Sequence, residues 1–311
     1  MKGASVLVYS HADFLNHLTP PGHPEQVARL AAVERGLAGL VLERREAMVA
    51  PDAEVLRCHP ARYLARLRDA VPAAGWAQLD GDTYLSPGSL TAALRAVGGV
   101  CAAVDAVLAG EAANAFVAGR PPGHHAETET AMGFCLFGTV AIAARRALDH
   151  HRLSRVAIVD FDVHHGNGTQ ELLWDEGRCL FVSSHQMPLY PGTGASDERG
   201  AHGQVLNVPL PGGSGGAEMR RAYEAQVFPA LAAWRPELIL VSAGFDAHRA
   251  DPLAGLLWEA SDYAWLTGRI CDLAAEFAQG RVVSALEGGY DPEALAASVA
   301  AHVGVLEERG R

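Results

Sequence analysis

Four short segments of the sequence concentrate side chains that can bind a metal ion or transfer a proton. These side chains are carboxylates, imidazoles, one amide and one phenol: His124, His125, Asp160, Asp162, His164, His165, Asn167, Asp246, His248, Glu287, Tyr290 and Asp291. A single Asp-x-Asp or His pair is usually a turn former, a helix cap or a solvated group. Four such clusters favour a shared site, because buried charges are costly unless a cation or a hydrogen-bonded network compensates them.

Asp162, His164 and Asp246 are the candidate metal ligands. Asp162 and His164 alternate along an extended segment, so both side chains can face the same side, and Asp246 comes from a distant part of the chain. Carboxylate and imidazole ligands without sulfur suit Zn²⁺ or Fe²⁺, whereas alkaline-earth ions would need more oxygens. Three ligands leave room for water and substrate. We therefore expect a catalytic metal centre, with zinc as the first choice and ferrous iron as the second.

Each cluster directly follows an apolar segment of strand character. The candidate strands lie at 5–10, 114–119, 155–161, 179–184, 205–210, 237–243 and 281–286. Segments with helical spacing alternate with them, at 25–42, 89–109, 134–149, 217–233, 262–279 and 292–308. This alternation predicts an α/β fold with a mostly parallel β-sheet flanked by helices on both faces. Ligands in such sheets bind beyond the carboxyl ends of the strands, so we expect the four clusters to meet there.

The whole chain, residues 1–311, is expected to form a single domain. Its composition, 49% hydrophobic and 20% charged, is that of an ordinary globular protein. The sequence shows no internal repeat, and its Gly-rich stretch at 211–216 is too short to divide the chain, so we interpret it as a loop.

Charge and cysteine content limit the partners of the protein. The formal net charge of −11 opposes binding to a phosphate backbone, so we expect no nucleic-acid partner. Five scattered cysteines without a CxxC pair indicate reduced thiols. The N-terminal apolar run is too short for a signal-peptide core, and no segment approaches 18 unbroken apolar residues. These features predict a cytoplasmic protein without a membrane partner, and they leave the oligomeric state open.

The motifs around these residues resemble those of the histone deacetylase and acetylpolyamine amidohydrolase superfamily. They are RPPGHHAETETAMGFC, DFDVHHGNGTQ, HQMPLYPGTG, SAGFDAH and LEGGYD. They follow the family order, from HPEQVAR at 23–29 to GGYD at 288–291, and five ordered motifs are far more specific than one glycine signature. The sequences RPPGHHA and HPE are similar to those of the class II branch. The resemblance implies an arginase/deacetylase-like fold and metal-assisted hydrolysis of a linear amide.

Individual roles follow from the resemblance position by position. It implies that Asp162, His164 and Asp246 bind zinc, that His124 and His125 form the catalytic histidine pair, with His125 as general base, and that Tyr290 polarises the acyl carbonyl. It also implies that Asp160 and Asn167 lie behind the two histidines and set their tautomers and basicity. A structural K⁺ ion is implied at backbone carbonyls that would involve Asp160, Asp162, His164 and Ser183.

The resemblance also predicts the substrate tunnel. Its walls would include Gly133, Phe134, Tyr190 and, at the mouth, Leu253. Tyr190 stands where the family often has Phe, so we expect a more polar wall. A second departure is Gly138, where most class II enzymes have Asn, and the sequence offers no reason for it. His165 and His185 lie within the motifs, and we expect them to support the structure through buried hydrogen bonds.

Three functions fit these residues. The first is deacylation of acyl-lysine in proteins or peptides; the second is hydrolysis of small acetylated amines such as polyamines. The polyamine-selective relative carries Glu seven positions after its last zinc ligand, where this chain has Leu253, so we expect acyl-lysine to be favoured. The third is a catalytically silent acyl-lysine binder. Such a protein should lack Tyr290, a histidine of the pair or a metal ligand, and none of these is missing. A dimanganese ureohydrolase would need more metal-bridging aspartates, one of them where His248 stands.

Overall fold

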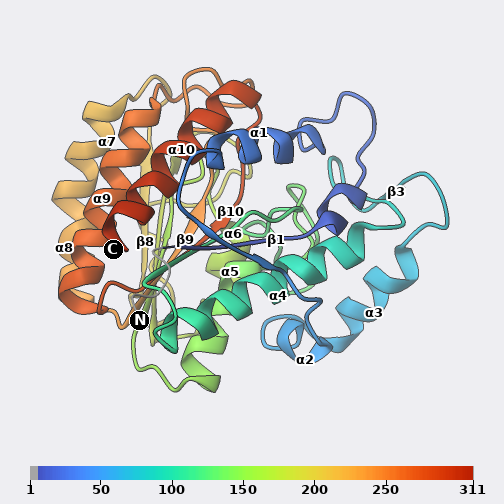
Figure 1. Ribbon diagram of the computed structural model, residues 1–311, viewed down its shortest axis with the longest axis horizontal. Helices are drawn as coiled ribbons and strands as arrows, with labels where there is room; N and C mark the ends of the chain where they lie inside the picture. Colours follow the sequence, from blue (N-terminus) through green and yellow to red (C-terminus); the bar gives the residue numbers. More distant parts are fainter. Residues whose placement is uncertain (1–5, 311) are drawn as a thin grey trace.

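The protein is built around an eight-stranded, fully parallel β-sheet. The computed structural model describes residues 6–310 (Figure 1). In spatial order the strands are β2 (Glu43–Glu46), β1 (Val6–Ser10), β5 (Asn114–Val117), β10 (Val282–Leu286), β9 (Leu238–Ala243), β6 (Val156–Asp160), β7 (Cys179–Gln186) and β8 (Val205–Leu210). A small antiparallel pair, β3 (Ala77–Gln78) and β4 (Tyr84–Leu85), lies outside this sheet. The predicted α/β class is therefore confirmed, and the sheet is parallel throughout.

Helices connect the strands. They are α1 (Ala28–Leu37), α2 (Asp52–Val55), α3 (Ala61–Ala70), α4 (Ser89–Leu108), α5 (Thr139–Arg145), α6 (Asn167–Leu172), α7 (Gly216–Ala222), α8 (Phe228–Trp234), α9 (Ala260–Phe277) and α10 (Pro292–Arg309). A 3₁₀ turn, η1 (Ala12–Asn16), and two π-helical turns, η2 (Arg146–His150) and η3 (Tyr223–Val227), complete the set. The local sequence explains where helix α10 begins. The Asp291 side chain accepts from the amides of Glu293 and Ala294, and Pro292 occupies the first turn.

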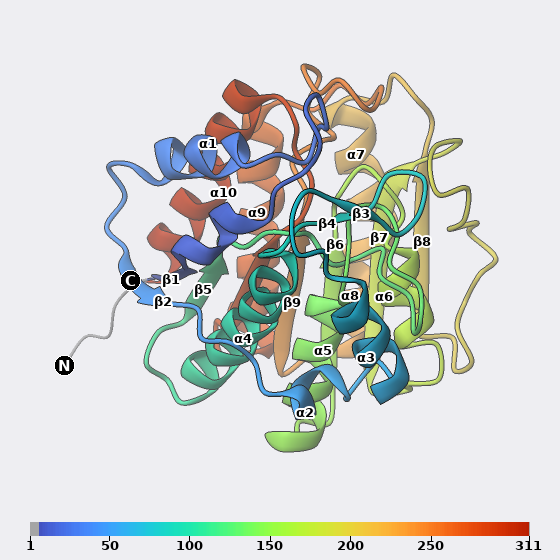
Figure 2. The ribbon, with the colours of Figure 1, turned by 90° about the vertical axis from the view of Figure 1, so that its right-hand side faces the viewer.

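Helices cover both faces of the sheet. Alternate residues of each strand point to opposite faces, so Val6 and Val8 join the core under α1 and α7 to α10, whereas Leu7 joins the core under α4 to α6. Figure 1 shows these two helical layers, and α1 lies along α10 in both Figure 1 and Figure 2. Because the strands are buried on both faces, they appear in the sequence as continuous apolar runs.

Helix α4 forms much of one layer. Within residues 6–310 it is the one helix that is long and apolar enough to cross a membrane by length and composition. However, 72% of the apolar window is buried inside the protein, where α4 packs on β1, β5 and β10. This burial is typical of a core helix.

Several predicted element boundaries were wrong. A helix was predicted at 134–149, but the observed helix begins only at Thr139. Gly133 and Phe134 have positive φ angles of 52° and 68°, which are incompatible with a right-handed helix. Strand β2, with the sequence ERRE, was not predicted because a charged edge strand lacks the apolar signal. The loop at 211–216 and the seven predicted strands are confirmed to within two residues.

The centre of the sheet brings the four chemical clusters together. Strands β5, β10, β9 and β6 are consecutive neighbours, and each is followed by one cluster. Their ends are level, since Ala285 of β10 pairs with both Val117 and Ser242, and Ser242 pairs with Asp160. The loops that follow therefore start at the same height along one sheet edge.

Candidate metal centre and active site

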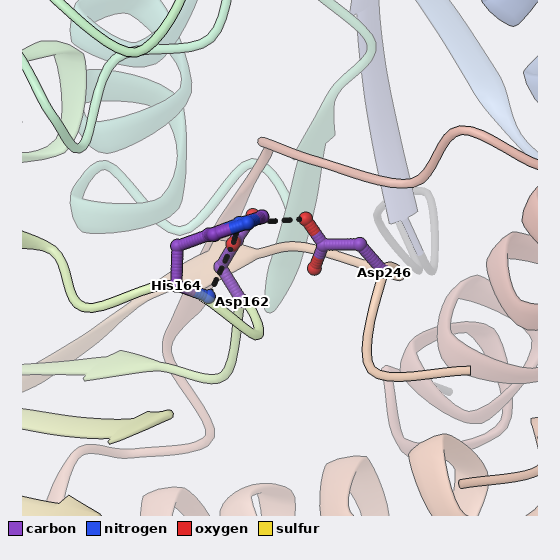
Figure 3. Close-up of side chains that lie close together, drawn as sticks. All are labelled: Asp162, His164 and Asp246. Carbon is purple, nitrogen blue, oxygen red and sulfur yellow. Dashed lines mark hydrogen bonds and ion pairs between the residues drawn. The ribbon is translucent and has the colours of Figure 1, made fainter. Parts of the chain in front are cut away.

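Asp162, His164 and Asp246 form a compact buried triad at this edge (Figure 3). One potential ligand atom from each lies within 4.8 Å of the others. His164 Nδ1 is 3.0 Å from Asp162 Oδ1 and 3.3 Å from Asp246 Oδ2. Asp162 and His164 alternate after β6, as the sequence predicted, and Asp246 comes from the loop after β9. The structure thus brings together the three residues predicted as metal ligands.

The surroundings of the triad fit a cation. Within residues 6–310, the fully buried Asp246 Oδ2 accepts no hydrogen bond of acceptable geometry and has the 3.3 Å ion-pair contact with His164, so a buried carboxylate oxygen remains available to bind a cation. Burial alone would lower the pKa of His164, but Asp162 and Asp246 raise it to about 10, so the triad attracts positive charge. A Cβ at Gly244 would lie 2.1 Å from Asp162 Oδ2, so only glycine allows the backbone to approach this closely.

The two histidines after β5 have opposite electrostatic surroundings. His124 Nδ1 lies 3.0 Å from Asp160 Oδ2, and its Nε2 lies 3.7 Å from Asp162 Oδ1. Burial opposes the charged form of His124, but Asp162 and Asp160 raise its pKa well above the usual value. Burial and then the neighbouring His124 instead lower the pKa of His125, so its imidazole is neutral.

Asn167 fixes the tautomer of His125. Asn167 Nδ2 donates to Glu127 Oε1 at 2.8 Å, which leaves its Oδ1 to accept from His125 Nδ1 at 2.7 Å. The free acceptor of the imidazole is therefore Nε2. The structure thus places Asp160 beside His124 and Asn167 beside His125, each within hydrogen-bonding distance of Nδ1.

Glu287 lies in the motif LEGGYD, but the sequence analysis assigned it no role. Its buried Oε2 accepts the amides of Gly123 at 2.6 Å and His124 at 3.1 Å, and its Oε1 has no hydrogen-bond partner among residues 6–310. Burial raises the pKa of Glu287 to about 7, although the nearby His124 opposes this shift. Glu287 therefore ties the end of β10 to the backbone of the histidine pair.

Tyr290 lies beside the triad at the end of a glycine-containing turn. Its ring lies edge-on to Phe134, with centroids 5.8 Å apart, and the Arg29 guanidinium is 4.9 Å from its centroid. Arg29 also donates to the carbonyls of Glu287 and Gly289. Burial raises the pKa of Tyr290 well above its usual value, so the phenol stays protonated.

Arg29 belongs to a buried ionic network that sequence reasoning missed. Glu25 accepts from both Arg29 and Arg120, and His17 Nε2 lies 3.3 Å from the same carboxylate. Arg120 begins the RPPGHHA motif, so Glu25 connects the loop of the histidines to the turn of Tyr290. The motif HPEQVAR contains both Glu25 and Arg29, so it was the feature of the sequence that could have indicated this network.

A cavity of about 350 Å³ leads to these groups. Its lining contains all four predicted tunnel residues and three groups of the site: His23, Pro24, Gly81, Asp82, Tyr84, His125, Gly133, Phe134, His164, Leu189, Tyr190, Leu253 and Tyr290. Gly133 packs so tightly that a Cβ would lie 2.4 Å from the His125 ring. Leu253 is 36% exposed, as expected at a mouth. The sequence did not predict His23 or Asp82, because neither lies in a strand-end cluster.

The remaining motif residues have structural explanations. Gly138 donates its amide to His59 Nε2, and a Cβ there would lie 2.3 Å from Leu172 Cδ1, so a larger residue requires the Leu172 side chain to move. His165 and His185 are buried and hydrogen-bonded to Thr193, Gln170, Ser183 and Gly194. His248 accepts from the Ala250 amide and lies outside the triad.

Comparisons with known proteins agree with this geometry. Residues 23–306 match the family described as the histone deacetylase domain. The chain is 44% identical over 300 residues to an uncharacterized protein of Synechocystis sp., covering 94% of this chain and 96% of the relative. It is 42% identical over 273 residues to a histone deacetylase-like amidohydrolase of Pseudomonas aeruginosa, covering 86% and 71%. The crystal structure of the HDA15 HD domain superposes with a TM-score of 0.92 at 32% identity, covering 98% and 90%. The chain therefore belongs to the histone deacetylase family and is a hydrolase of the deacetylase type.

Proposed function

We propose that the protein is a zinc-dependent deacylase that removes acyl groups, acetyl above all, from the ε-amine of lysine in proteins or peptides. The observation that carries this proposal is the meeting of three kinds of group at one cavity. A buried carboxylate–imidazole triad, a neutral histidine with a fixed tautomer and a protonated tyrosine lie together there. This is the set of groups that metal-assisted amide hydrolysis requires.

Asp162, His164 and Asp246 would hold the zinc ion. When bound, zinc would supply Lewis acidity to the amide carbonyl and to the attacking water. The absence of sulfur ligands also permits ferrous iron.

His125 would move the protons of the reaction. Its Nδ1–H is engaged by Asn167 and its pKa is lowered by burial, so Nε2 can accept a proton from the attacking water. The resulting imidazolium would then protonate the leaving amine. His124, held between Asp160 and Asp162, would remain charged and stabilise negative charge in the transition state.

Tyr290 would stabilise the oxyanion. Because burial keeps its phenol protonated, it can donate a hydrogen bond to the carbonyl oxygen as negative charge develops there. The edge contact with Phe134 and the Arg29 guanidinium beside the ring limit the motion of the side chain.

The cavity walls support acyl-lysine as the substrate. Phe134, Tyr190 and Leu253 supply apolar surface that can pack on the methylene chain of a lysine. One observation favours the alternative, a small acetylated polyamine: Asp82 also lines the cavity, and its carboxylate could pair with a second ammonium group. Leu253 offers no such partner, so we rank acyl-lysine first.

Steady-state kinetics of the zinc-loaded enzyme test the proposal. We expect kcat/KM for an acetyl-lysine peptide to exceed that for N8-acetylspermidine, and a tenfold preference for the polyamine would reverse the ranking. Chelation should abolish both activities. Asp162→Ala, His164→Ala and Asp246→Ala should lose activity together with metal, measured by elemental analysis, because removing a ligand removes the Lewis acid. Full activity after chelation would refute the metal-dependent mechanism.

A further inference from the structure

A buried carboxylate outside the triad contacts the turn that carries Tyr290. Asp251 is only 7% exposed and lies in the loop after β9, five residues beyond Asp246. Its Oδ2 accepts the backbone amide of Tyr290 at 2.7 Å, and its Oδ1 accepts the amide of Leu253 at 3.0 Å. Within residues 6–310 the Asp251 carboxylate forms no ion pair, and its hydrogen-bond partners are these two backbone amides.

These contacts place Tyr290 relative to the metal ligands. The segment 246–251 contributes Asp246 to the triad at one end and Asp251 to the Tyr290 amide at the other. Gly288 is held by a metal ligand and by the residue before another one, since its amide donates to Asp162 Oδ2 at 2.8 Å and its carbonyl accepts from the Phe245 amide at 3.0 Å.

The peptide between these fixed points is held from two sides, because Arg29 Nε donates to the Gly289 carbonyl at 2.7 Å and Asp251 accepts the Tyr290 amide. Gly289 has a φ of +120°, a region that other residues rarely adopt, so its own backbone energetics do not fix the direction of the next residue. The hydrogen bonds to Arg29 and Asp251 therefore set the direction in which the chain enters Tyr290, and the bond to Asp251 is the one that the Tyr290 backbone itself makes.

We propose that Asp251 is a positioning residue that fixes Tyr290 relative to the triad, and the same carboxylate holds Leu253 at the mouth. The inference rests on the proposed role of Tyr290 as oxyanion donor. Asp251 acts through the backbone of Tyr290 and does not touch the substrate. An oxyanion donor displaced by about 1 Å can cost roughly 100-fold in rate, so loss of this bond should lower kcat more than it raises KM.

Asp251→Asn tests this directly. The amide side chain keeps the shape but has one acceptor oxygen, so one of the two backbone amides loses its partner. We expect kcat for an acetyl-lysine peptide to fall at least tenfold, KM to change less than threefold, and the metal content to stay unchanged. In the Tyr290→Phe background the same substitution should change kcat less than twofold, because the hydroxyl to be positioned is already absent.

Asp262→Asn is the matched control. Asp262 is also a buried carboxylate that accepts a backbone amide, that of Glu259 at 2.9 Å, but it belongs to the capping box of α9, pairs with Arg220 and lies away from the Tyr290 turn. We expect it to lower the melting temperature and leave kcat within twofold in both backgrounds. Asp251→Ser, a smaller substitution with one acceptor, should repeat the Asp251→Asn pattern if the latter folds poorly.

The outcomes separate this inference from the proposed function. Wild-type turnover in Tyr290→Phe would refute the role of Tyr290 and with it the inference. A large loss in Tyr290→Phe, together with an equal loss from Asp251→Asn in both backgrounds, would overturn the inference alone. Unchanged kcat in both Asp251→Asn and Asp251→Ser, with each variant folded, would also overturn it.

Discussion

Gly288→Ala should disrupt the metal centre without changing any ligand. A Cβ at position 288 would lie 2.0 Å from Asp246 Oδ2 and 2.6 Å from Asp162 Oδ2. The first distance is about 1.4 Å short of ordinary van der Waals contact, so a carboxylate or the backbone must move by about that much. Gly288 does not have a positive φ, so the added methyl group introduces no backbone strain of its own.

The expected magnitude follows from the precision that metal binding requires. Ligand distances at a metal site vary by only about 0.2 Å, several times less than the forced displacement. Even changes behind the ligands commonly weaken metal binding 10- to 100-fold, so we expect Gly288→Ala to lose zinc affinity by at least about 100-fold. The metal-free protein should lose roughly 1–3 kcal/mol of unfolding free energy from the overpacking.

Competition with a chromophoric chelator measures the zinc affinity of the metal-free protein. Gly304→Ala is the control, because a Cβ at this position in α10 would meet its nearest neighbour, Leu40, only at 3.8 Å. It should bind zinc as the unmodified protein does. If Gly288→Ala also bound zinc with unchanged affinity, the triad in this arrangement would not be the metal site.

Three further predictions concern catalysis, substrate choice and acid stability. Tyr290→Phe should retain zinc and lose roughly 10²–10³ in kcat with little change in KM, and wild-type turnover would contradict its role. Leu253→Glu should raise kcat/KM for N8-acetylspermidine about fivefold, the equivalent of an exposed ion pair of about 1 kcal/mol, whereas the neutral Leu253→Gln should not. Burial lowers the pKa of His302 to about 3, below its usual value near 6.5. The unfolded state therefore takes up a proton that the folded state does not as pH falls below 6.5. Urea unfolding should show the unmodified protein losing about 2 kcal/mol more than His302→Gln between pH 7 and 5, with a slope that approaches about 1.4 kcal/mol per pH unit toward pH 5, and parallel profiles would contradict this.

The sequence predicted those features that depend on local pattern. Strands such as β6 and β9 are buried on both faces, so their apolar runs and the polar groups that follow them are visible along the chain. Asp162 and His164 are two residues apart, and their shared side follows from strand geometry alone. Strand β2 carries four charged residues at a sheet edge, so no local pattern could reveal it.

Features that depend on distant partners could not be predicted. Arg29 bonds the carbonyl of Gly289, which is 260 residues away, and Asp251 bonds an amide 39 residues away. Backbone acceptors and donors have no signature in the sequence, so only the fold reveals such contacts. The fit of Gly138 against Leu172 likewise depends on how α5 and α6 pack.

The position of β10 has a consequence for how the site assembles. The last strand of the chain lies between β5 and β9, so without it the sheet consists of two halves, β2-β1-β5 and β9-β6-β7-β8. The triad follows β6 and β9 in one half, whereas the histidine pair follows β5 in the other. Strand β10 closes the sheet between the two halves, and the loop after it delivers Tyr290 to the place where His124 and His125 contact Asp160 and Asn167.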